Sequence, residues 1–381
     1  MLRINARGVV LTSIIALVLV LLFVAQWKRN EIDAWRSAYA GASTPDIANQ
    51  DNKLEEFKDD ATATPSPPDF TAANSTLGVS LLPSPFMTKK RGFADTNTTQ
   101  FQAILALSQG TPWRVNGLHA AAKVSGITVT VPQQPKWSDP FIKAFQEFGP
   151  IEAHGAAMAW LGHLDLLKFV IQHNWGSALI LEDDMDWDVE IRKQMPPIAK
   201  AVKELTKAKK GDTQPYGSNW DVLWLGHCSD PPPFPKEGKI ITFADNTTAP
   251  VDKYRGLNPR LKDVVKDNQR IVHYSINPVC TFAYAVSHAG ARNLLAHASL
   301  GKGGAFDLML MHACQDKVLK CVSVNPEVFD PYFPAEGGAS EVRAGDAGVD
   351  FDHEVGKAMG HTDNTARSAR CFAQFGTTCL E

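Results

Sequence analysis

Short apolar runs alternate with amphipathic stretches along the middle of this chain, from about residue 99 to residue 335. The runs are short enough for buried strands, and the stretches between them repeat apolar residues at helical spacing. The expected strands are 101–108, 127–131, 178–181, 221–226, 281–287 and 320–326. The expected helices are 117–125, 140–148, 152–173, 188–207, 288–298 and 306–312. This alternation predicts an α/β domain with a mainly parallel sheet flanked by helices.

The clearest predicted helix runs from Glu152 to His173, with Trp160 and Leu164 on its apolar face. His154 and Gly155 stand at its start, where free backbone N–H groups can bind an anion. His163 lies farther along the same helix. Both histidines are candidate ligands, and packing inside the fold is the alternative role for each.

An apolar stretch, Val9–Ala25, precedes this domain and has basic residues on both sides. A signal peptidase cut after Ala25 would need a small residue where Phe23 stands, so we expect an uncleaved membrane anchor. Residues 1–29 are thus interpreted as a cytoplasmic tail and transmembrane helix. Residues 30–98, acidic and broken by prolines at 65–68, are interpreted as a flexible stem. The domain would span 99–335, followed by a C-terminal tail at 336–381 that a disulfide could close.

Two features indicate that the domain lies in the lumen of the secretory pathway. Asn74, Asn97 and Asn246 begin triplets that accept N-linked glycans. The six cysteines form no Cys-x-x-Cys pair, so disulfides are expected rather than a zinc site. Cys314 with Cys321, and Cys371 with Cys379, are close enough in sequence to close small loops, although the pairing stays open. We therefore expect a single-pass type II protein of the Golgi or ER membrane.

The overall charge is small, with 38 basic and 41 acidic residues and a net charge of −3. Such a balance produces no field that would attract a polyanion. We predict no nucleic-acid partner.

The most informative segment is Ala178–Asp188, in which an apolar strand runs directly into five carboxylates. Ionised carboxylates are too costly to bury unpaired, so they should emerge at the strand's C-terminal end, where open α/β sheets bind ligands. Extended geometry would place Glu182 and Asp184 on one face and Asp183 on the other. Two oxygen ligands from one turn suit a divalent cation that also holds phosphate oxygens. The alternative is an acidic turn in which Asp186 or Asp188 caps the next helix.

These elements, in this order, resemble glycosyltransferase family 25, which includes lipopolysaccharide-type and collagen galactosyltransferases. The similarity rests on four blocks that span about residues 100 to 330. They are Phe101–Ser108 with Arg114, Gly155–Leu164, Ala178–Asp184, and Tyr284–Leu295 followed by Asp307. Two departures are the single Arg114, where the family has two or three arginines, and Met158 and Gly162, where it has glycine and serine.

The resemblance implies a GT-A-like (Rossmann-like) fold and a UDP-sugar donor, with galactose as the expected sugar. Mn²⁺ or Mg²⁺ would be held by Glu182 and Asp184, with Asp183 close by as a ribose or supporting partner. Arg114, His154, Gly155 and His163 would contact the donor. A late histidine could be a third cation ligand, and His288, His312 and His353 remain open for this role.

A transfer that inverts the sugar's anomeric centre also needs a base for the acceptor hydroxyl. Asp307 is the candidate, and simple helix capping is its alternative role. The predicted activity is transfer of a sugar to a hydroxyl of a glycan or glycoprotein. The alternatives are a catalytically inactive lumenal scaffold and a metal-dependent hydrolase.

Overall fold

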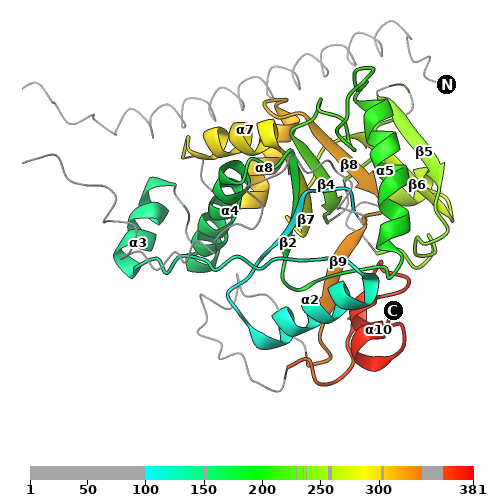
Figure 1. Ribbon diagram of the computed structural model, residues 1–381, viewed down its shortest axis with the longest axis horizontal. Coiled ribbons are helices and arrows are strands. Elements are labelled where there is room, and N and C mark those ends of the chain that lie inside the picture. Colours follow the sequence, from blue (N-terminus) through cyan, green and yellow to red (C-terminus); the bar gives the residue numbers. More distant parts are fainter. Residues whose placement is uncertain are drawn as a thin grey trace, which may run out of the picture. The chain divides into compact units, whose positions relative to one another are not determined.

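A seven-stranded sheet forms the centre of the domain in the computed structural model (Figure 1). The structure describes residues 99–381 except 150, 152, 229, 235, 237, 256–259, 302–303 and 337–354. In spatial order the strands are β1 (Ala103–Leu107), β2 (Ser177–Glu182), β7 (Ala283–Ser287), β4 (Val222–Gly226), β8 (Cys321–Asn325), β6 (Gln269–Tyr274) and β5 (Ile240–Ala244). The prediction of an α/β domain with flanking helices is confirmed.

The sheet is mixed, so the prediction of a mainly parallel sheet was wrong. Only β1–β2 and β4–β8 pair in parallel; the other neighbouring strands are antiparallel. An apolar run buried on both faces shows that a strand is central but not which way it points. The antiparallel pair β5–β6 is not among the strands expected from the sequence. The expected strand 127–131 contributes only one bridge, between Thr130 and Leu105.

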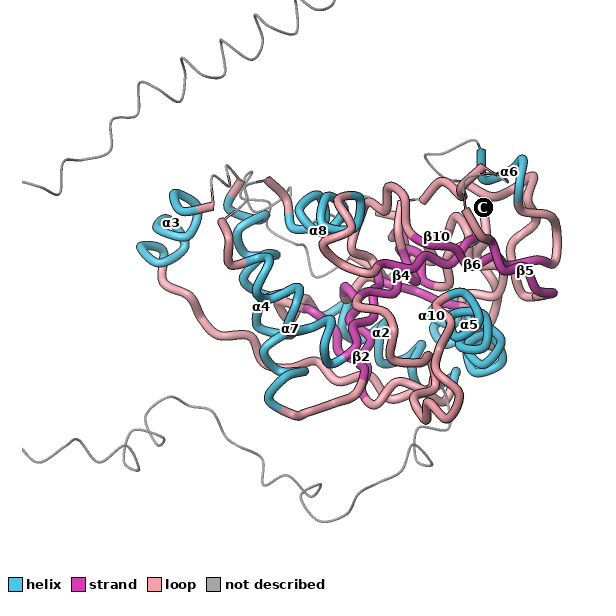
Figure 2. The backbone as a smooth tube through the Cα atoms, turned by 90° about the horizontal axis from the view of Figure 1, so that it is seen from above, coloured by secondary structure: helices cyan, strands magenta, loops and turns pink. Residues whose placement is uncertain are grey.

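Helices cover both faces of the sheet, as Figures 1 and 2 show. On one face pack α4 (His154–Gln172), α7 (His288–Ala298) and α8 (Phe306–Gln315), against Ile180 and Trp224 of the sheet. On the other face pack α2 (Pro112–Ser125) and α5 (Ile191–Leu205), against Leu179 and Leu181. Successive residues of β2 thus enter opposite cores, which explains its unbroken apolar sequence. Helix α3 (Asp139–Phe148) packs on α4, and the short α6 (Arg260–Val264) lies near β6.

A second, three-stranded sheet continues the chain beyond β2. Its strands are β3 (Met185–Trp187), β9 (Phe329–Phe333) and β10 (His361–Thr362), all antiparallel. Helix α10 (Ala369–Phe375) follows β10 and packs against α2. Residues that we placed in a C-terminal tail therefore contribute a strand and a helix to the body of the domain.

All six cysteines form disulfides, as Cys228–Cys280, Cys314–Cys321 and Cys371–Cys379. The two short loops considered from the sequence are among them. Three disulfides fit an oxidising compartment, either lumenal or secreted. Within the described part of the chain, no helix is long and apolar enough to cross a membrane. The predicted anchor, the stem, Asn74 and Asn97 lie outside the described residues, whereas Asn246 is exposed in a turn after β5.

Candidate functional site

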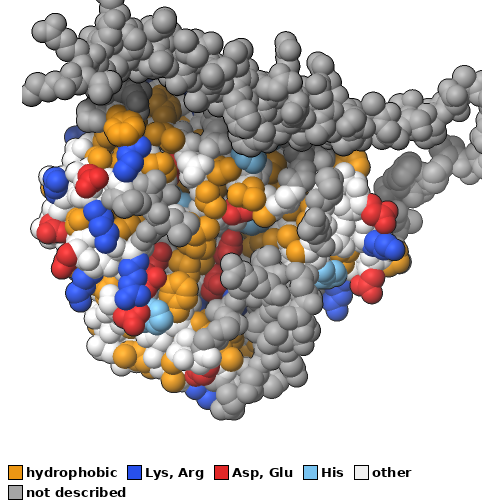
Figure 3. Space-filling model, turned by 180° about the vertical axis from the view of Figure 1, so that it is seen from behind, with side chains coloured by type: hydrophobic (Ala, Val, Ile, Leu, Met, Phe, Trp, Pro, Cys, Tyr) orange, Lys and Arg blue, Asp and Glu red, His pale blue; other side chains and the backbone are white. Residues whose placement is uncertain are grey.

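The acidic turn, defined as Glu182, Asp183 and Asp184, joins β2 to β3 at the C-terminal end of β2. Strand geometry stops at Glu182, so the predicted alternation of Glu182 and Asp184 against Asp183 was wrong. Instead, the carboxylates of Asp183 and Asp184 both pair with one guanidinium, that of Arg114. The Nη1 atom of Arg114, in the first turn of α2, lies 2.8 Å from Asp183 Oδ1 and 3.0 Å from Asp184 Oδ2. On the face shown in Figure 3, acidic side chains gather near the centre, between apolar ones.

Glu182 has a different partner, because the Thr281 hydroxyl donates a 3.0 Å hydrogen bond to its Oε1. Burial, and then the charge of Asp184, raise the pKa of Glu182 to about 8. Burial also raises the pKa of Asp184, against the opposing effect of the Arg114 guanidinium. Burial therefore favours the protonated forms of Glu182 and Asp184, because the nearby positive charge is too small to stabilise both as carboxylates.

Two carboxylate oxygens in the turn fit a bound cation. Asp183 Oδ2 and Asp184 Oδ1 are buried and have no hydrogen-bond partner. Buried acceptors are nearly always satisfied, so each of these oxygens is available to a bound ligand. The acidic turn does not close into a three-residue cage, since the described residues contain one such group and it lies elsewhere. An open site with one or two carboxylates suits Mn²⁺ or Mg²⁺ shared with a diphosphate.

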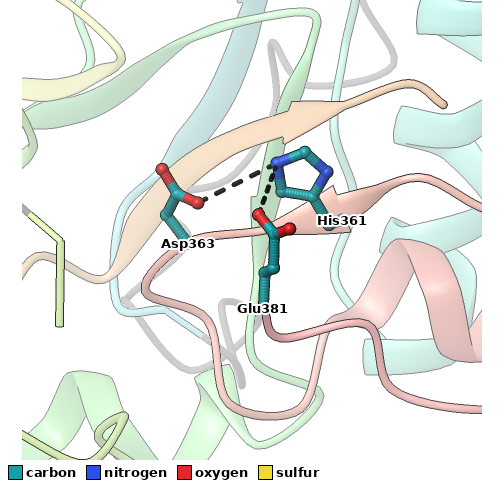
Figure 4. A group of neighbouring side chains, drawn as sticks. All are labelled: His361, Asp363 and Glu381. Atoms are coloured by element: carbon teal, nitrogen blue, oxygen red, sulfur yellow. Dashed lines mark ion pairs between the residues drawn. The ribbon is translucent and has the colours of Figure 1, made fainter. Parts of the chain in front are cut away.

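That other group is His361, Asp363 and Glu381 (Figure 4). The Nε2 atom of His361 lies 3.4 Å from Glu381 Oε2 and 3.9 Å from Asp363 Oδ1. Arg255 Nη1 already pairs with both carboxylates, at 3.3 Å from Asp363 and 3.0 Å from Glu381. With solvent access and a cation supplied by the protein, this is a surface ion-pair cluster.

His154 and Gly155 begin α4, and the C-terminal end of this helix leads into the start of β2. The start of α4 and the acidic turn consequently lie toward the same end of the sheet, with His154 exposed and Gly155 buried. His163 is 1% exposed and stacks on Phe306. Its ring nitrogens lie 3.1 Å from the Tyr284 hydroxyl and 3.5 Å from the Thr281 hydroxyl.

Burial lowers the pKa of His163 to about 3, so this histidine is neutral. It lies behind Glu182 and reaches it through Thr281. The neighbouring Gly162 has a packing role, because a Cβ there would lie 2.4 Å from Leu107 Cδ1. Helix α4 therefore approaches the Leu107 side chain, at the end of β1, closely at this position.

Asp307, the second residue of α8, is half-buried and accepts two backbone hydrogen bonds. Cys280 N donates to Oδ2 at 3.1 Å and Leu308 N to Oδ1 at 2.9 Å. The backbone of Cys280 adopts the left-handed conformation (φ 69°), and its side chain forms a disulfide with Cys228. Because Thr281 follows Cys280, the residue that binds Asp307 adjoins the one that binds Glu182.

The three histidines considered as a third cation ligand, His288, His312 and His353, lie in different parts of the chain. Ser287 pairs with Ser177, so the adjacent His288 lies beside the N-terminal end of β2. The acidic turn lies at the C-terminal end of the same strand. Its Nδ1 instead lies 3.2 Å from Trp175 O. His312 is exposed on α8, and His353 lies outside the described residues.

Asp186 and Asp188 hold the C-terminal segment of the chain. Asp186 accepts hydrogen bonds from Ser368 Oγ and from Arg370 N, whereas Arg367 pairs with Asp188 at 3.0 Å. Asp188 also accepts from Glu190 N at 2.8 Å, next to the start of α5. The residue before α5 is Glu190, and no side chain caps this helix, so the expectation that Asp186 or Asp188 caps it was wrong.

Sequence reasoning missed Arg370, which is fully buried beneath the acidic turn. Its Nη2 donates to Asp183 O at 2.9 Å. The only sequence signal was a cysteine at the next position, which implied some local order but no role.

No model of a protein family matches the sequence, and no curated protein matches it at a significant level. The resemblance to glycosyltransferase family 25 therefore stays a prediction.

Proposed function

We propose that this protein is a glycosyltransferase that moves a sugar from a UDP-sugar to a hydroxyl of a glycan or glycoprotein, in the manner of family 25. The observation that carries the proposal is the acidic turn at the end of β2. There, Asp183 and Asp184 each keep one buried, unpartnered oxygen beside Arg114. The three disulfides support a lumenal setting, and the Golgi or ER membrane remains the proposed location.

Asp184 is the proposed direct cation ligand, with Glu182 as the second. Bound Mn²⁺ or Mg²⁺ would neutralise the charge that develops on the leaving diphosphate. Asp184 suits the role because Oδ1 is unpartnered while Oδ2 is held by Arg114. Glu182 is oriented by Thr281 through one oxygen only. With a pKa of about 8, Glu182 must release its proton before it can act as a ligand.

Arg114 is the proposed electrostatic partner of the donor. Its side chain is 5% exposed, and its guanidinium pairs with both Asp183 and Asp184. The positive charge therefore lies next to the proposed binding place of the diphosphate. A buried guanidinium next to phosphate oxygens is strongly stabilising because water cannot screen it. His154 and Gly155, at the exposed start of α4, are proposed to contact the donor through backbone N–H groups.

Asp307 is the proposed base for the acceptor hydroxyl. Its two backbone hydrogen bonds, from Cys280 and Leu308, fix the direction of the carboxylate and leave it half-exposed. An aspartate so held can accept a proton from a hydroxyl brought against it. The disulfide Cys228–Cys280 makes this support a covalent part of the fold.

Donor hydrolysis tests the proposal without knowledge of the acceptor. The purified full chain, in detergent, is expected to hydrolyse UDP-galactose more rapidly when Mn²⁺ is added. Asp184→Ala is expected to abolish this stimulation, whereas Asp363→Ala, in the surface cluster, leaves it unchanged. Full activity in Asp184→Ala would overturn the cation assignment. A wild-type protein that releases UDP from no UDP-sugar would overturn the proposed activity.

A further inference from the structure

The carbonyl groups of the acidic turn are held by residues from the second half of the chain. Arg370 Nη2 lies 2.9 Å from Asp183 O and 3.4 Å from Met185 O. The carbonyl between them, Asp184 O, accepts a 2.9 Å hydrogen bond from Tyr332 N. Three successive carbonyls are thereby held by hydrogen bonds from Arg370 and Tyr332.

The guanidinium of Arg370 is itself tightly constrained. It lies 5.2 Å from the ring centroid of Tyr332 and 5.8 Å from that of Trp113. Nη2 also donates to Arg114 O at 3.3 Å, so one group supports both the acidic turn and the helix turn that carries Arg114. A Cβ at Gly117 would lie 2.5 Å from Arg370 Nη1, which shows how closely α2 approaches it.

The backbone around Arg370 is anchored independently. Arg370 N and Ser368 Oγ both donate to Asp186, which follows the acidic turn on β3. Cys371, the next residue, is fully buried and bonded to Cys379. The segment is therefore attached to the fold even when the Arg370 side chain is changed, so the side chain's role can be tested separately.

We infer that Arg370 is a positioning residue that holds the acidic turn and Arg114 in the geometry that binds the cation and the donor diphosphate. The reasoning is geometric: Asp184 can aim its carboxylate only if its backbone is fixed, and Arg370 binds the carbonyl on either side of it. The hydrogen bonds all come from Nη2 of a planar guanidinium that lies beside the rings of Tyr332 and Trp113, whereas a lysine ammonium is a compact point charge without that plane. Residues that orient metal ligands commonly change affinity or activity by about 10- to 100-fold.

The catalytic part of this inference rests on the proposed function, so the test has one readout that depends on activity and one that does not. The variants are Arg370→Met, which removes the charge, and Arg370→Lys, which retains it. Gly117→Ala pushes on the guanidinium without removing it. The matched control is Arg367→Met, three residues earlier, because Arg367 is half-exposed and binds Asp188 rather than the acidic turn.

Hydrogen exchange of the full chain, followed by mass spectrometry, reads the positioning directly. Segment 181–187 is expected to exchange at least about tenfold faster in Arg370→Met than in wild type or Arg367→Met. Gly117→Ala and Arg370→Lys should fall between them. Unchanged exchange at 181–187 in Arg370→Met would overturn the inference, whether or not the protein is an enzyme.

The dependence of donor hydrolysis on Mn²⁺ concentration gives the second readout. Arg370→Met is expected to raise the half-saturating Mn²⁺ concentration by at least about tenfold. A loss of folded protein would lower the rate but leave that concentration unchanged. An unchanged half-saturating concentration in an active Arg370→Met would overturn the inference. Wild-type protein with no activity would instead overturn the proposed function, while the exchange result still decides the role of Arg370.

Discussion

Glu182→Gln should stabilise the metal-free protein at alkaline pH while removing its cation-dependent activity. The folded state raises the pKa of Glu182 from 4.5 to about 8, first through burial and then through Asp184. The folded protein thus binds this proton more tightly than the unfolded chain does. The free energy of unfolding must therefore fall as pH rises from about 4.5 to about 8.

The size of the effect follows from the width of that interval. At about 1.4 kcal/mol per pH unit, ionising Glu182 in the folded state costs at most about 5 kcal/mol at pH 8 and above. Relaxation of the site and the coupling to Asp184 should reduce this to about 1–3 kcal/mol. Glutamine has the shape of the protonated acid and can still accept the Thr281 hydrogen bond at Oε1, so it avoids the cost.

The assay is urea unfolding in EDTA, followed by tryptophan fluorescence between pH 5 and pH 9. Wild type and Glu182→Gln should have similar unfolding free energies at pH 5, and the variant should become the more stable one as pH rises. Adding Mn²⁺ should stabilise wild type more than the variant. Parallel curves across the whole pH range would refute the burial and crowding that we assign to Glu182.

Two further substitutions test the base and the packing of the sheet. Asp307→Asn should lower sugar transfer by about 10²- to 10⁴-fold while UDP binding persists, measured by transfer kinetics and calorimetry; lost UDP binding would make Asp307 a donor residue. Gly290→Ala should destabilise the protein by at least about 1–3 kcal/mol in urea unfolding, because a Cβ there would lie 2.0 Å from Asp221 O. Unchanged stability in Gly290→Ala would show that α7 packs less closely on β4.

Local patterns predicted the elements that build one end of the site. The run Ala178–Leu181 is apolar because both faces of β2 are buried, and helix 288–298 was predicted with the bounds that the structure has. The carboxylates after Leu181 predicted where the strand would end. All of these signals come from residues close together in the sequence.

The features that were missed depend on contacts between distant residues. The direction of β7 between β2 and β4 is a property of the connections, not of its own residues. Strand β5 is largely solvent-facing and so lacks a buried apolar run. Arg370 lies 187 positions from Asp183, and its burial is possible only because carbonyls from across the fold converge on it. Asp186 likewise found its partners in Ser368 and Arg370 rather than in the next helix.

The central claim is that the acidic turn binds a nucleotide diphosphate through a divalent cation. Isothermal titration of UDP into the purified full chain, with Mn²⁺ and then with EDTA, tests it most directly. The account predicts binding in Mn²⁺ that is lost in EDTA and in Asp184→Ala. Binding of UDP with equal affinity in EDTA, or in Asp184→Ala, would contradict it.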